Sequence, residues 1–88
     1  MILVIYDVAD NKKRRRIVKL LESYGNRVQK SAFECDISQA SVMEIERRAL
    51  ELIDVEEDSF RLYSMNSYNT LFSIGGPEQE KTKEFDVV

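Results

Sequence analysis

The sequence contains no histidine and no tryptophan, and it has one cysteine and one proline among its 88 residues. Because Cys35 is the only thiol, an internal disulfide is excluded, and without histidine a zinc site is disfavoured. Most pairs of a nucleophile and a general base are also unavailable. The three glycines form neither a phosphate-binding loop nor a dinucleotide-binding fingerprint. Carboxylate side chains are therefore the remaining source of catalytic chemistry.

The chain also lacks long hydrophobic runs, and no apolar segment approaches the ~18–20 residues that span a bilayer. Its apolar start, MILVIYD, has no positively charged flank and no small-residue cleavage site, so we interpret it as a strand rather than a signal peptide. Together with the single cysteine, these absences indicate a cytoplasmic protein without a membrane partner.

The formal net charge is −3, but the charges are unevenly distributed along the chain. Residues 1–31 hold eight cations and three acids, a net charge of +5, whereas residues 32–88 hold five cations and thirteen acids, a net charge of −8. This division predicts one surface that attracts anions and one that repels them. The charges could instead be ordinary solvated charges of the helices, or folding could mix the two halves in space.

The first part of the chain has the pattern of a strand followed by a helix. Residues 2–8 form a β-branched and aliphatic run, which is typical of a central strand covered on both faces. Asp10 or Asn11 is expected to cap the helix, and Gly25 to end it. Its apolar stripe has the spacing i, i+3, i+4, i+7 and consists of Ile17, Leu20, Leu21 and Tyr24.

A second strand-and-helix pattern follows. Residues 27–37 are extended in character, and a bend or tight hairpin is expected near Lys30–Ser31. Ser38 or Ser41 is expected to cap the second helix. The apolar face of that helix consists of Val42, Ile45, Ala49, Leu52 and Ile53.

Two strands are expected after an acidic turn, over residues 59–65 and 69–74. The resulting order fits the ferredoxin-like α+β plan, an antiparallel sheet with two helices on one face, over residues 1–76. The remainder, residues 77–88, is a polar tail with an apolar end, EFDVV. Such an end suits a final strand that pairs with an exposed edge of this chain or of a partner.

Asp7 ends the most hydrophobic strand, away from the ordinary surface carboxylates. Carboxylate oxygens are the usual ligands of Mg²⁺ and Mn²⁺, which can activate water and neutralise a phosphodiester. One aspartate is a poor metal site, but a homodimer that brings Asp7 against its symmetry mate gains the second carboxylate. The alternative interpretation is that Asp7 caps or braces the turn between the strand and the helix.

Five consecutive cations mark the start of the first helix: Lys12, Lys13, Arg14, Arg15 and Arg16. The helix macrodipole is positive there, so each cation loses up to ~1 kcal/mol by its placement. The same position suits phosphate binding. We therefore interpret the block as a contact to a nucleic-acid backbone, without base reading. Phe33 could stack on a base, although a strand phenylalanine more often packs in a core.

Four motifs occur in a fixed order along the chain. An aliphatic strand ends in Tyr6-Asp7, a basic helix follows, YGNRVQKSAFE occupies residues 24–34, and DSFRLY occupies residues 58–63 after the acidic turn. In this order and spacing they resemble the family of the second CRISPR-associated protein, the small subunit of the spacer-acquisition machinery. The likeness covers about residues 2–64, and SMNSYN at residues 64–69 departs from the commoner pattern.

The resemblance implies a ferredoxin-like homodimer in which the two sheets face each other and each C-terminal strand extends the partner's sheet. It implies an endonuclease on single-stranded RNA or duplex DNA, with Mg²⁺ (or Mn²⁺) held between the two Asp7 carboxylates. Arg27 joins the five helix cations as a nucleic-acid contact. The supporting positions that it implies are Tyr6, Arg14, Arg16, Arg27, Ser31 and Phe33.

The resemblance also implies a central bridge between two dimers of the CRISPR integrase, bound to the duplex DNA that becomes a new spacer. Two alternatives remain. One is a non-catalytic scaffold that binds DNA with its basic face and docks the integrase with its C-terminal strands. The other is a ribonuclease toxin of the virulence-associated protein D type, which shares this fold and chemistry.

Overall fold

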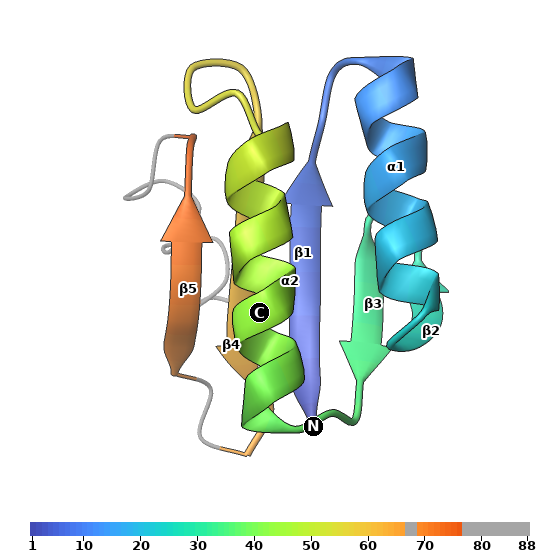
Figure 1. Ribbon diagram of the computed structural model, residues 1–88, viewed down its shortest axis with the longest axis vertical. Helices are drawn as coiled ribbons and strands as arrows, with labels where there is room; N and C mark the ends of the chain where they lie inside the picture. Colours follow the sequence, from blue (N-terminus) through green and yellow to red (C-terminus); the bar gives the residue numbers. More distant parts are fainter. Residues whose placement is uncertain (67–68, 77–88) are drawn as a thin grey trace.

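A computed structural model describes residues 1–66 and 69–76, which form one five-stranded antiparallel sheet and two helices. Both helices lie on the same face of the sheet (Figure 1). The strand order is β2-β3-β1-β4-β5, so β1 is central. The predicted α+β plan is confirmed, whereas the predicted tail strand lies outside the described residues. In chain order the elements are β1 (Ile2–Asp7), α1 (Asn11–Glu22), β2 (Gly25–Gln29), β3 (Ala32–Cys35), α2 (Gln39–Leu52), β4 (Ser59–Ser64) and β5 (Thr70–Ile74).

The hydrophobic core lies between the sheet and the two helices. Val4 and Tyr6 of β1 point into it, as strand alternation requires, and both are buried. The predicted helix stripes supply the opposite side, with Ile17 and Leu21 from α1 and Ile45 and Ala49 from α2. Each fully buried large apolar side chain contributes roughly 1.5–3 kcal/mol, which holds the helices in place over β1. Neither helix in the described part of the chain has the length and apolarity that a membrane crossing requires.

The start of α1 agrees with the prediction, but its end does not. Asp10 is the N-cap, and its carboxylate accepts a hydrogen bond of 2.9 Å from the Lys13 backbone N–H. The helix ends at Glu22 with Ser23 as its C-cap, and Gly25 is already the first residue of β2. A Cβ atom at Gly25 would lie 2.1 Å from the Glu34 carbonyl oxygen. The glycine therefore allows β2 and β3 to approach, and its predicted role as helix terminator was wrong.

The hairpin predicted near Lys30–Ser31 is confirmed as the turn between β2 and β3. Ser38 caps α2, since its hydroxyl accepts a hydrogen bond from the Ser41 backbone N–H. β4 ends at Ser64, one residue before the predicted end. Gly75, with φ of 77°, follows β5.

The strand register decides which residues share the helix-free face of the sheet. Asp7 of β1 lies opposite Ser59 of β4, and Ile5 lies opposite Arg61, which in turn lies opposite Ser73 of β5. Val4 and Tyr6 face the helices, so Ile5 and Asp7 face away from them. Arg61 is nevertheless only 4% exposed, and β4 is buried on both faces.

Candidate active site at the end of the first strand

A hollow of about 200 Å³ lies at the end of β1, beside the start of α1 and the β2–β3 turn. Four of the residues predicted from the sequence lie around it, so segments far apart in the chain converge there. Sequence reasoning missed Lys30, which the hairpin turn carries to the same place. The only signal in the sequence that could have indicated Lys30 was the predicted turn, in which Lys30 is the neighbour of the predicted site residue Ser31. The lining residues are Asp7, Val8, Arg14, Arg27, Lys30 and Ser31.

Asp7 is exposed, and among residues 1–66 and 69–76 no hydrogen bond or ion pair engages its carboxylate. The helix is capped by Asp10 instead. The interpretation of Asp7 as a cap or brace of the turn is therefore wrong. Both carboxylate oxygens remain available to a ligand from solvent.

Two arginines at the rim of the hollow are oriented by backbone contacts. Arg14 Nη1 donates to the Val8 carbonyl oxygen at 3.0 Å, and Nη2 donates to the Asn11 side-chain oxygen. Arg27 Nη2 donates to the Lys30 carbonyl oxygen at 2.9 Å. These bonds use part of each guanidinium, and both arginines line the hollow. The arrangement is typical of pre-oriented anion contacts.

Tyr6 and Phe33 support the site from inside the core. Their ring centroids are 6.3 Å apart, and both side chains are buried. The Tyr6 hydroxyl donates to the Lys30 carbonyl oxygen at 3.3 Å, and its backbone N–H donates to the Ser31 carbonyl oxygen at 3.1 Å. Tyr6 thus fixes the hairpin turn against β1. Because Phe33 is fully buried, it cannot stack on a base, and its contribution is packing.

Asp58 supplies the brace that sequence reasoning assigned to Asp7. It is 2% exposed, and it accepts hydrogen bonds of 3.1 Å from the backbone N–H groups of Ala9 and Asp54. Lys13 Nζ lies 3.6 Å from its Oδ2 atom. Burial opposes ionisation of Asp58, but the two backbone donors and the Lys13 ammonium outweigh it and lower its pKa. This carboxylate joins the β1–α1 turn to the start of β4.

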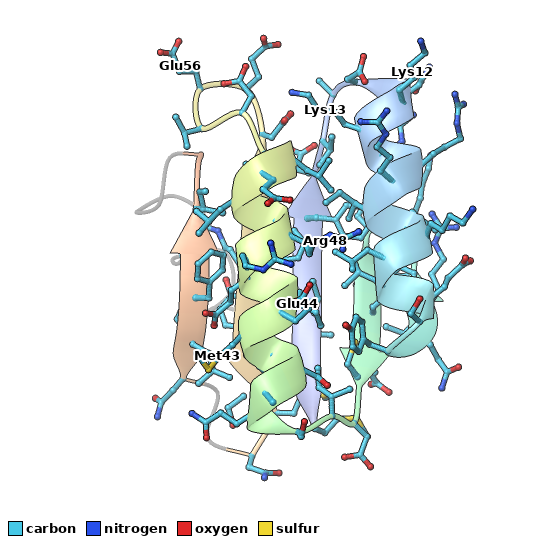
Figure 2. The ribbon with its side chains drawn as sticks, in the orientation of Figure 1. Lys12, Lys13, Met43, Glu44, Arg48 and Glu56 are labelled. Atoms are coloured by element: carbon cyan, nitrogen blue, oxygen red, sulfur yellow. The ribbon has the colours of Figure 1, made fainter. Side chains whose placement is uncertain are left out.

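The five cations at the start of α1 divide into two groups. Lys13 and Arg14 contact other parts of the protein, as described above. Lys12, Arg15 and Arg16 are exposed and have no hydrogen bond or ion pair to another described residue. Lys12 and Lys13 lie at the same end of the molecule as Glu56 of the acidic turn (Figure 2). At this end, folding therefore brings the two oppositely charged halves of the sequence together.

A second hollow, about 560 Å³ in volume, lies between the two helices. Its cationic lining comes from Arg16 and Lys19 of α1 and Arg48 of α2. Arg48 Nη1 lies 3.8 Å from a Glu44 oxygen, so its charge is partly offset. Glu51 lines the hollow as well, so the groove between the helices continues the cations of the helix start with a smaller excess of positive charge.

The donor set at the end of β1 suits a hard cation such as Mg²⁺, because carboxylate oxygen is the preferred ligand of that ion. A single copy supplies too few ligands, however. Within the described ranges, no group of three or more acidic or cysteine side chains could hold a metal ion. The described residues of one copy therefore do not form a metal site by themselves.

Residues 1–70 match the family model described as CRISPR associated protein Cas2. The chain belongs to the Cas2 family. This assignment confirms the resemblance drawn from the Tyr6-Asp7, YGNRVQKSAFE and DSFRLY motifs. It places the chain with Cas2 proteins rather than with the ribonuclease toxins considered above.

Curated Cas2 relatives are similar over most of the chain. A CRISPR-associated endoribonuclease of Synechocystis is 38% identical over 66 residues, which cover 75% of this chain and 72% of the relative. A CRISPR-associated endonuclease of Halalkalibacterium halodurans is 36% identical over 76 residues, covering 80% of this chain and 79% of the relative. The crystal structure of Cas2 from Streptococcus pyogenes has a TM-score of 0.68 and 39% identity, covering 73% of this chain and 83% of that one.

Proposed function

We propose that this Cas2 chain acts as a homodimer that cleaves nucleic-acid phosphodiesters with the help of a divalent metal ion, within CRISPR adaptation. The supporting observation is the state of Asp7. Its carboxylate ends the central strand, has no partner within the described ranges, and borders a hollow lined by Arg14, Arg27 and Lys30. The names of the relatives, endoribonuclease and endonuclease, agree with this chemistry.

In this proposal the two Asp7 carboxylates of the dimer face each other and hold Mg²⁺ or Mn²⁺. The bound ion would supply a Lewis acid and an acidified water for hydrolysis. The residues of the chain hold the substrate in place. Arg14 and Arg27, oriented by the Val8 and Lys30 carbonyl oxygens, contact the phosphate groups beside the cleaved bond. RNA and DNA both satisfy these contacts, because the contacts involve the backbone and no base.

Substitution of Asp7 tests this proposal. Asp7→Ala should lower metal-dependent cleavage by at least about a hundredfold, since the ion loses its protein ligand. Asp36→Ala is the matched control, because Asp36 is also an exposed aspartate and lies outside the lining of the hollow. Cleavage of labelled RNA and duplex DNA is measured with Mg²⁺, with Mn²⁺ and with EDTA. Unchanged metal-dependent cleavage by Asp7→Ala would contradict the enzymatic role.

A second candidate function is a scaffold that binds duplex DNA and bridges integrase dimers without cleaving. The exposed cations of α1 favour it, since Lys12, Arg15 and Arg16 have no partner among the described residues and continue toward Arg48. In this role, Asp7→Ala should retain both duplex binding and spacer acquisition. Loss of acquisition together with cleavage would favour the enzymatic function instead.

The proposed backbone contacts predict a specific salt dependence. Each phosphate contact that is lost should reduce the slope of log affinity against log salt by about one. Arg15→Gln and Arg16→Gln are therefore expected to flatten the slope, and Arg47→Gln is the control because Arg47 is paired with Glu44 and Glu51 on α2. Equal slopes for all three variants and the wild type would contradict the assignment.

A further inference from the structure

Arg61 and Ser73 lie opposite each other on the helix-free face of the sheet, and both have buried polar atoms that no described residue hydrogen-bonds. Arg61 lies on β4 and is 4% exposed, and Ser73 lies directly opposite it on β5. The Arg61 Nε and Nη2 atoms and the Ser73 hydroxyl are buried, and no described residue accepts a hydrogen bond from them. Buried polar groups in native proteins almost always have partners, so this pair indicates a missing ligand.

The Arg61 and Ser73 atoms without a partner among the described residues indicate which kind of ligand would fit. A guanidinium stays charged in proteins, and Nε–H and Nη2–H leave the same edge of its plane. This edge matches the two oxygens of a carboxylate and binds them with two parallel hydrogen bonds. The neighbouring Ser73 hydroxyl can donate a third. The pair is therefore suited to receive one carboxylate.

Two carboxylates on the same face have no hydrogen bond or ion pair among the described residues, Glu34 of β3 and Asp7 of β1, and only Asp7 is on a strand next to Arg61. Asp7 lies opposite Ser59, one diagonal step from Arg61, which lies opposite Ile5. Diagonal neighbours across two strands are about 7–8 Å apart, and within the described residues Asp7 and Arg61 form no ion pair. A sheet face that carries an unpaired cation on one strand and an unpaired anion on the next is complementary to itself when rotated by 180°, as a twofold interface requires.

We propose that Arg61, assisted by Ser73, binds the Asp7 carboxylate of a second copy of this chain across the two helix-free faces. The twofold arrangement rests on the proposed function, which also brings the two Asp7 residues together. Without a metal ion, two facing carboxylates repel each other. The two Arg61 side chains offset this repulsion, so the dimer persists when the metal is absent.

The first test measures the dimer dissociation constant in EDTA by sedimentation equilibrium. Arg61→Gln should weaken the dimer roughly thirtyfold or more, because Asp7 loses its buried partner. Ser73→Ala, which keeps the charge and a small side chain, should weaken it a fewfold. Arg48→Gln removes an exposed cation on the helix side and should leave the constant unchanged. A dimer of Arg61→Gln as tight as the wild type would overturn the proposal.

The second test mixes two variants and separates pairing between copies from pairing within one copy. In a heterodimer of Asp7→Asn with Arg61→Gln, one intact ion pair remains and the other site is neutral on both sides. Each homodimer instead has two sites with one unpaired charge. Native mass spectrometry of the mixture, with one variant carrying a mass tag, should therefore show heterodimers well above the statistical half.

The outcomes separate this inference from the proposed function. A statistical mixture with a dimeric wild type would overturn the Arg61–Asp7 contact and leave the two-carboxylate site standing. A wild-type chain that is monomeric both in EDTA and in Mg²⁺ would overturn the two together.

Discussion

Asp7 and Asp58 lie at the same end of neighbouring strands and have opposite environments. Asp58 directly precedes Ser59, the residue opposite Asp7 in the β1–β4 register. It is buried and bonded to Ala9, Asp54 and Lys13, whereas Asp7 is exposed and has no partner in the described residues. A carboxylate whose oxygens are already bonded stabilises the protein. A carboxylate whose oxygens are free is available for a ligand. The contacts of Asp58 and Asp7 therefore distinguish a structural carboxylate from a candidate ligand-binding one.

The largest expected effect in this comparison is on stability. Asp58→Ala should lower the free energy of unfolding by about 3 kcal/mol, because it leaves two backbone N–H groups and Lys13 without their acceptor. Asp7→Ala should change it by less than about 0.5 kcal/mol, as expected for an exposed side chain without contacts. Urea unfolding, at a dilution where the chain is monomeric, measures both.

Amide hydrogen exchange provides the local control for the same pair of variants. The Ala9 and Asp54 amides donate to Asp58, so their protection should be lost in Asp58→Ala and kept in Asp7→Ala. Equal unfolding free energies for the two variants would show that the contacts of Asp58 carry no stability.

The Asp58 backbone lies close to Gly75, and this contact predicts a second, smaller loss of folding stability. A Cβ atom at Gly75 would lie 2.0 Å from the Asp58 carbonyl oxygen, and Gly75 has φ of 77°. Gly75→Ala should therefore cost about 2 kcal/mol in urea unfolding. Gly75→Asn is the matched variant, because asparagine tolerates positive φ but still adds a Cβ atom. If Gly75→Asn is as stable as the wild type, the contact with Asp58 is unimportant and the strain alone explains the loss.

Much of the fold was predictable because its determinants are local or periodic. The run in β1, the stripe of α1 and the Asp10 cap each depend on residues a few positions apart. Gly25 was misassigned for the opposite reason. A glycine after a helix usually ends it, but this glycine is required by the Glu34 carbonyl oxygen on another strand. That contact has no local signature.

The candidate site was predictable in part, for the same physical reason. Asp7 and Arg14 stand out by their positions at a strand end and a helix start, and the hollow contains both. Asp58 looked like one more acid in a solvated turn, and Arg61 like the polar side of an alternating strand. Their importance comes from burial and from partners distant in the sequence, which only the folded chain reveals.

Strong acid should weaken the brace at Asp58, because the contacts that its carboxylate makes depend on its ionised form. Burial opposes ionisation of Asp58, but the Asp54 and Ala9 N–H groups and Lys13 hold its pKa below the ordinary value. A lowered folded-state pKa stabilises the protein above the ordinary aspartate pKa of about 3.9, and this stabilisation is lost as the pH falls through the folded-state pKa. The stability difference between the wild type and Asp58→Asn should therefore shrink on acidification. A difference that stays constant with pH would contradict an ionised Asp58.

The smallest expected effect compares two adjacent lysines, only one of which has a partner. Lys13→Gln should cost about 0.5 kcal/mol, because it removes an ion pair whose lysine is partly exposed. Lys12→Gln should be neutral or slightly stabilising, because a cation at a helix start opposes the macrodipole.

For duplex binding, the substitution of Lys12 should have the larger effect of the two. Lys12→Gln should reduce the salt slope by about one, whereas Lys13→Gln should leave it unchanged, because Asp58 already holds the Lys13 ammonium. Equal slopes would mean that Lys13 exchanges Asp58 for phosphate, and the brace would then loosen when nucleic acid binds.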